Sequence, residues 1–232
     1  MNNLTCNNPT CNNPTGNTWA RRAAVIAFAA VAALGSGVVT AQSLEDTWRA
    51  ALDGDLMTVQ RAVERGFSVD TTDQEGNSLL MLAARSGHTP IVSYLLAQKV
   101  AVNARNRFGD SALMAAALKG HVETARVLVA GGAEVNPSGW TPLHYAAFEG
   151  RAPMVRFLLE QRADKNAVAP NEFTPLMLAV RNGHEEAARA LLHGDPDVNY
   201  RTSASGDSAL KLALQKGYAP VVDLLKRAGA VE

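Results

Sequence analysis

Five histidines are the side chains of this chain best suited to bind a metal ion or to transfer a proton. Three of them, His88, His121 and His184, directly follow a glycine at the same place in three segments of similar sequence. A repeated sequence places equivalent side chains on successive layers of the fold rather than around one ion. Only His193 lies off the repeated pattern, since His144 falls in a Thr-Pro-Leu-His segment. We therefore expect no metal site and no cofactor.

Other patterns that support catalysis are absent from the sequence. There is no Gly-x-Ser-x-Gly elbow and no Gly-x-x-x-x-Gly-Lys phosphate loop. The two cysteines, Cys6 and Cys11, both lie in a repeated Cys-Asn-Asn-Pro-Thr unit near the N-terminus, so a chain that begins at Gln42 has no cysteine for a disulfide or a metal. We expect that the protein is not an enzyme.

The charge of the chain also excludes a class of partner. Lysine and arginine number 22 and aspartate and glutamate number 22, which gives no net charge. A nucleic-acid-binding protein usually carries a basic field. We expect no nucleic-acid partner.

Glycines recur along the chain with a period of about thirty-three residues. Gly54, Gly87, Gly120, Gly150, Gly183 and Gly217 are separated by 33, 33, 30, 33 and 34 residues. Each glycine ends an alanine-rich segment, and a period in this range is typical of a stacked array of short repeats. The sequence therefore predicts a solenoid, without a single globular core.

The repeated segments resemble the ankyrin repeat. One of them runs Thr141-Pro-Leu-His-Tyr-Ala-Ala147, others carry a Gly-His step, and an asparagine closes four units, at Asn103, Asn136, Asn166 and Asn199. The resemblance implies an all-α solenoid of about six stacked helix-turn-helix repeats with short β-hairpin fingers between them. It also implies a role in protein binding.

The predicted ankyrin-repeat domain covers residues 42–232. Its repeats are expected at about 44–73, 74–106, 107–136, 137–169, 170–203 and 204–232. In the first and last repeats, Thr47 and Lys226 replace apolar residues of the other repeats, so we expect capped ends and a monomeric chain.

Two departures from the repeat pattern predict local changes. Lys99, Arg162 and Asp195 replace the glycine that ends the second helix of a repeat, at a conformational cost if the positive φ is kept. The spacing from Asn136 to Gly139 is three residues short, which predicts a truncated finger between the third and fourth repeats.

Residues 1–41 are expected to be a low-complexity leader followed by a signal peptide. The pair Arg21-Arg22 precedes a run without charge from Ala23 to Ala41, and the run ends in small residues at Val39 and Ala41. We expect cleavage after Ala41 by the general secretion route, which removes two arginines and leaves a net charge of −2. The alternative is a retained signal anchor, because nineteen uncharged residues come close to the length of a membrane span.

The binding face is expected on the finger tips and on the exposed side of each first helix, where partners dock in similar repeats. Apolar and basic side chains gather there in consecutive repeats, as is common at interfaces. The candidate protein-binding residues are Arg85, Arg107, Phe108, Leu118, Lys119, Trp140, Phe148, Glu149, Phe173 and Arg181. The alternative is that Trp140 or Phe148 packs locally beneath the shortened finger.

The function predicted from the sequence is a non-enzymatic scaffold that binds another protein through this face. Its resemblance to small exported ankyrin proteins of bacteria implies a periplasmic location, with no membrane contact after cleavage. One alternative is a secreted factor that acts on a host protein. Another is an enzyme with an unrecognised site.

Overall fold

The computed structural model describes residues 41–231. The predicted leader, with Cys6, Cys11 and the residues up to Thr40, lies outside these residues. Within them, twelve helices form six consecutive antiparallel pairs. The first, inner helices of the pairs are α1 (Ala41–Asp53), α3 (Leu79–Ser86), α5 (Ala112–Lys119), α7 (Pro142–Phe148), α9 (Pro175–Arg181) and α11 (Ala209–Lys216). The second, outer helices are α2 (Leu56–Glu64), α4 (Thr89–Ala97), α6 (Val122–Ala130), α8 (Ala152–Glu160), α10 (Glu185–Leu192) and α12 (Ala219–Arg227).

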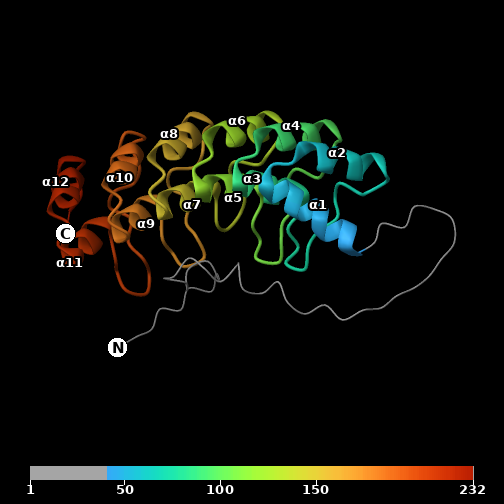
Figure 1. Cartoon of the computed structure of the whole chain (residues 1–232). Coiled ribbons are helices and arrows are strands. Elements are labelled where there is room, and N and C mark those ends of the chain that lie inside the picture. Colours follow the sequence, from blue (N-terminus) through green and yellow to red (C-terminus); the bar gives the residue numbers. More distant parts are fainter. Residues whose placement is uncertain (1–40, 232) are drawn as a thin grey trace.

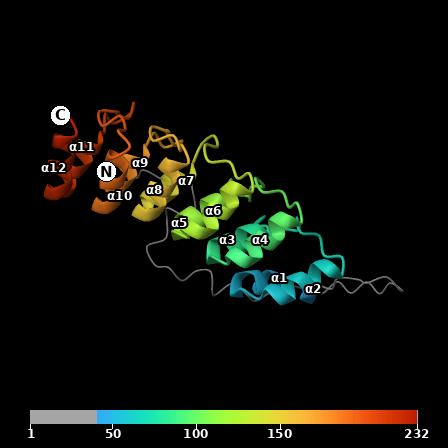
Figure 2. The same cartoon turned by 90° about the horizontal axis from the view of Figure 1, so that it is seen from above.

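The pairs stack into a two-layered solenoid, which confirms the predicted fold class. Figure 1 shows the inner helices side by side in one row, the outer helices in a second row above them, and the connecting loops below. Seen from above in Figure 2, the pairs follow one another in chain order from α1 and α2 to α11 and α12. Among the described residues, no helix is both long and apolar enough to span a membrane.

Local signals start each inner helix after the first. A serine or threonine stands at the N-cap, and its side-chain oxygen accepts a hydrogen bond from the backbone N–H three residues later. These caps are Ser78, Ser111, Thr141, Thr174 and Ser208, with N···O distances of 3.3, 3.3, 3.4, 3.3 and 3.2 Å. The predicted helix starts are therefore found where the hydroxyl residues are.

The core lies between repeats. One leucine of each inner helix after α1 is at most 1% exposed, and the alanine pairs that follow are nearly all fully buried. These leucines are Leu80, Leu113, Leu143, Leu176 and Leu210. Because alanine is small, neighbouring inner helices pack closely, and each repeat depends on its neighbours for a buried face.

The fingers are loops rather than regular hairpins. Antiparallel bridging among the described residues is limited to an isolated pair, Thr72 with Ser78. Four fingers are instead tight turns with two backbone hydrogen bonds each, as from the Asp73 N–H to the Asn77 carbonyl and from the Gly76 N–H to the Asp73 carbonyl, both 3.0 Å. The expectation of β-hairpins is thus corrected, because tight turns of this length leave no room for a ladder.

The connection between α6 and α7 is the short one, as its spacing predicts. Its loop reaches less far below the inner helices than the neighbouring loops do (Figure 1). Trp140, the residue before the Thr141 cap, is half-buried and packs against the hydrophobic core. The indole at this short connection is therefore packed against the core rather than fully exposed.

The side chains that replace glycine keep the left-handed backbone. Lys99, Arg162 and Asp195 have φ values of 60°, 62° and 54°. Glu172, in the finger before α9, adopts φ 63° as well, which the sequence did not suggest. Its carboxylate accepts hydrogen bonds from the Ser203 N–H at 2.8 Å and from the Ser203 hydroxyl. This link to the next finger offsets a conformational cost of about 1–2 kcal/mol.

Candidate functional site

The histidines that follow the turn glycines join adjacent repeats. The Nε2 atom of His88 lies 2.8 Å from the carbonyl oxygen of Leu52, and that of His184 lies 3.0 Å from the carbonyl of Phe148. The rings lie against the glycines of the preceding repeat, because a Cβ at Gly87 would come within 2.6 Å of the His121 ring. Within residues 41–231, no group of three metal-binding side chains gathers in one place. The geometry gives these histidines a structural role.

Arg151 takes the place of the histidine in the fourth repeat. Its Nε donates to the carbonyl oxygen of Leu118 at 3.2 Å. A Cβ at Gly120 would lie 2.9 Å from its side chain, as with the histidine rings elsewhere. The sequence signal for this role is the position of Arg151 directly after Gly150, where three other repeats have histidine.

His144 is the most deeply buried ionisable side chain of this region, with no exposed surface. Its Nδ1 accepts a hydrogen bond from the Thr141 N–H at 3.1 Å. Its Nε2 lies 3.0 Å from the carbonyl oxygen of Ala167 and 3.2 Å from that of Phe173, so the proton is on Nε2. Burial lowers the pKa of His144 to about 4, although the two carbonyls act in the opposite direction. The neutral ring therefore holds the next finger in place and is not positioned for proton transfer.

Trp140 lies over His144 and Tyr145. Its ring centroid is 5.6 Å from that of His144 in an edge-to-face arrangement and 5.7 Å from that of Tyr145. The buried Tyr145 hydroxyl donates to the carboxylate of Asp110, thirty-five residues earlier in the chain. Much of the Trp140 surface is thus used in local packing, the alternative that the sequence left open.

Four predicted residues form a row across the inner helices. Arg85, Leu118, Phe148 and Arg181 occupy equivalent positions in the last turns of α3, α5, α7 and α9, and all four are half-buried. These helices pack in this order (Figure 1), which places the four positions in a line from one repeat to the next. We call this set the inner-helix row. Lys119 and Glu149 are the next residues of the chain and are exposed.

The remaining predicted residues lie on the fingers. Arg107 is exposed and Phe108 is 41% exposed, which leaves an apolar ring in solvent. Phe173 is only 7% exposed, so its prediction as an exposed contact residue is wrong. The guanidinium of Arg181 covers its ring at 4.8 Å from the centroid. Phe173 therefore supports Arg181 from below.

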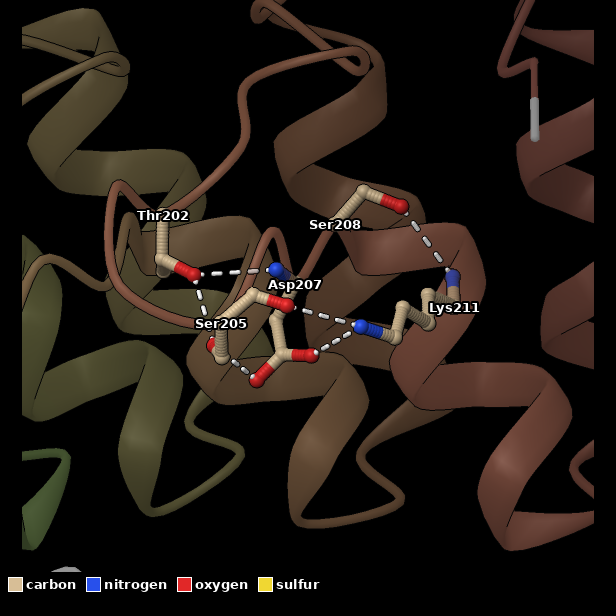
Figure 3. A network of polar contacts seen from close by, with 5 residues as sticks. All are labelled: Thr202, Ser205, Asp207, Ser208 and Lys211. Atoms are coloured by element: carbon tan, nitrogen blue, oxygen red, sulfur yellow. Dashed lines mark hydrogen bonds and ion pairs between the residues drawn. The ribbon is translucent and has the colours of Figure 1, made fainter.

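A hollow of about 210 Å³ lies at the C-terminal end of the described solenoid, between Arg201, Lys211 and Leu214. Figure 3 shows the polar network beside it, in which Lys211 pairs with Asp207 at 2.8 Å. The hydrogen bond from Lys211 and one from Ser205 lower the pKa of Asp207. The hollow is smaller than the roughly 300–1,000 Å³ of small-molecule sites. We therefore interpret the hollow as a surface depression at the last described repeat and not as a ligand site.

Comparison with known proteins agrees with this geometry. A family model described as "Ankyrin repeats (3 copies)" matches residues 47–138, 99–169 and 161–231. The crystal structure of the human ASB11 ankyrin repeat domain is similar to this chain with a TM-score of 0.73 and 24% identity, covering 80% of this chain and 84% of that one. That likeness supports the fold alone.

Curated relatives match in sequence over part of their length. Human "Ankyrin repeat and KH domain-containing protein 1" is 37% identical over 99 residues, which cover 42% of this chain and 4% of the relative. "Ankyrin repeat protein nuc-2" of Neurospora crassa is 30% identical over 140 residues, which cover 59% of this chain and 13% of the relative. The chain therefore spans a small fraction of these eukaryotic relatives.

Proposed function

The chain belongs to the ankyrin-repeat family, and we propose that it is a non-enzymatic scaffold that binds another protein through the inner-helix row and the finger before α5. The observation that carries this proposal is the pair Leu118 and Phe148. Both are apolar, lie side by side in adjacent repeats and keep part of their surface in solvent. Both also pack against the core, but the repeat does not require an apolar residue at this position, since Arg85 and Arg181 occupy it in other repeats.

The basic and aromatic residues around this pair suit an interface. Phe108 and Arg107 lie on the finger that precedes α5, and Arg181 follows in the same row. Aromatic and arginine side chains are the most frequent energetic centres of protein interfaces. Trp140 contributes through support of Tyr145 and His144 more than through its own exposed surface.

Export to the bacterial periplasm is part of the proposal. It is supported by the Arg21-Arg22 pair, the uncharged run and the Val39-Thr40-Ala41 junction, of which only Ala41 lies within the described residues. Helix α1 begins at Ala41, so cleavage after this residue leaves Gln42 at the start of the first repeat. Fractionation of the native cells tests this part, because a protein found in the culture medium would favour the secreted alternative.

Affinity capture from the native cells tests the binding role. The bait is the wild-type chain, and Phe148→Ser is compared with Met57→Ser, which removes a side chain that is 60% exposed on the outer helix α2. We expect the same protein to be captured by the wild type and the Met57 variant and to be lost with Phe148→Ser. Equal capture by both variants would place the interface elsewhere.

A further inference from the structure

The two apolar side chains of the inner-helix row are held on a fixed backbone. The carbonyl of Leu118 accepts a hydrogen bond from Arg151 at 3.2 Å. The carbonyl of Phe148 accepts one from the Asn182 side chain at 2.8 Å and faces His184 at 3.0 Å. Each bond joins one repeat to the next, so the spacing of Leu118 and Phe148 is set before any partner binds. Such preorganisation lowers the entropic cost of binding.

The carboxylates near this row are engaged within the chain. Asp110 accepts a hydrogen bond from the hydroxyl of Tyr145, and the carboxylate of Glu149 lies 3.7 Å from the guanidinium of Arg151. Further along the same face, Asp207 pairs with Lys211 at 2.8 Å. These contacts reduce the negative potential that the carboxylates offer to a partner.

Cations on the same face are not compensated in this way. Among residues 41–231, no ion pair involves Arg107, Lys119 or Arg181. The Arg181 guanidinium lies over the Phe173 ring at 4.8 Å from its centroid, and an arginine held over an aromatic ring in this way can still donate its N–H groups to a carboxylate. The face thus combines a central apolar pair with positive charge that lacks a counter-ion in the described chain.

We propose that the inner-helix row binds an extended acidic segment of the partner protein. Two apolar side chains of that segment pack on Leu118 and Phe148, and a carboxylate pairs with Arg181. This inference rests on the proposed function and adds the chemistry of the partner to it.

The spacing of the repeats sets the spacing of this segment. Neighbouring helices pack about 8–10 Å apart. A segment in the extended polyproline-II conformation advances about 3.1 Å per residue and completes a turn in three residues, so every third side chain points to the same side. One repeat therefore corresponds to about three residues of the bound segment. Every third residue of the segment contacts the row: first two apolar residues and then an acidic one, with polar residues between them.

Synthetic peptides test the inference. The probes are fluorescent peptides of about ten residues with Leu, Phe and Glu at every third position among serines and glycines, made in both sequence directions. One control has Gln for the Glu, and a second has the same composition with the three residues at every second position. Binding to the purified chain is measured by fluorescence anisotropy at low and at physiological salt.

We expect one direction of the Glu peptide to bind about tenfold more tightly than either control, with an affinity that falls as salt rises. Arg181→Gln and Phe148→Ser should each remove this preference. The matched control Arg156→Gln, at an exposed position of the outer helix α8, should leave it unchanged.

Equal binding of the Glu and Gln peptides, or no binding by any peptide, would overturn the inference. Failure of the proposed function would look different. If the peptides fail while capture of the native partner still depends on Phe148, the scaffold role stands and only the acidic segment is wrong.

Discussion

Acidification is expected to destabilise the solenoid through the buried imidazole of His144. A second proton on the ring would have to go to Nδ1, which already accepts the Thr141 N–H. Because burial lowers the folded-state pKa from 6.5 to about 4, the neutral ring is favoured in the folded chain. Its contribution is complete above about pH 6.5 and is lost as the pH falls toward about 4, since the unfolded chain takes up the proton first.

The size of the effect follows from the two pKa values. Each unit of difference corresponds to about 1.4 kcal/mol. Between about pH 7.5 and pH 5, the free energy of unfolding should fall by about 2 kcal/mol from this group alone. The total loss below about pH 4 is about 3 kcal/mol.

Urea unfolding followed by circular dichroism at these two pH values measures the loss. His144→Gln is the matched variant, because its amide can donate to the carbonyls of Ala167 and Phe173 but does not titrate. The variant should be less stable at neutral pH and should lose about 2 kcal/mol less than the wild type on acidification. If both proteins lose the same amount, protonation of the His144 imidazole is not the cause of the loss.

Three further predictions concern the core, the end of the stack and the leader. Leu143→Ala should lower the free energy of unfolding by about 2–5 kcal/mol because it leaves a cavity, and a loss below about 1 kcal/mol in urea would contradict its place in the core. Lys226→Leu should promote self-association, since the equivalent Leu96 packs against Gly131 of the next repeat, and a variant that stays monomeric in concentrated solution by light scattering would argue against a capped end. Mass spectrometry of the native protein should find Gln42 at the N-terminus, whereas a full-length chain in the detergent fraction would support the retained anchor.

The repeat fold could be predicted because its signals are local. The N-cap hydroxyls, the alanine pairs and the turn glycines recur at fixed spacing, and Ser111 or Gly120 has the same role in the structure as in the pattern. The φ values of Lys99 and Asp195 also follow from their places in the repeat. The finger loops were less predictable, because strand pairing depends on turn geometry that the spacing does not determine.

The site could be predicted only in part, because a position that varies between repeats need not be exposed. Phe173 replaces the buried Asn77 of the second repeat, so both positions face the interior although their side chains differ. The bond between Tyr145 and Asp110 joins residues thirty-five positions apart and has no counterpart in the repeat pattern. The inner-helix row, in contrast, follows directly from the repeat, because its four residues each lie two positions before a turn glycine.

Isothermal titration of the captured partner tests the central claim most directly. The wild type, Phe148→Ser and the control Met57→Ser are compared. Thermal unfolding of each protein first shows that all three are folded at the temperature of the titration. We predict that Phe148→Ser raises the dissociation constant by about tenfold or more and that Met57→Ser leaves it unchanged. Wild-type affinity for a folded Phe148→Ser variant would contradict the claim that the inner-helix row is the binding face.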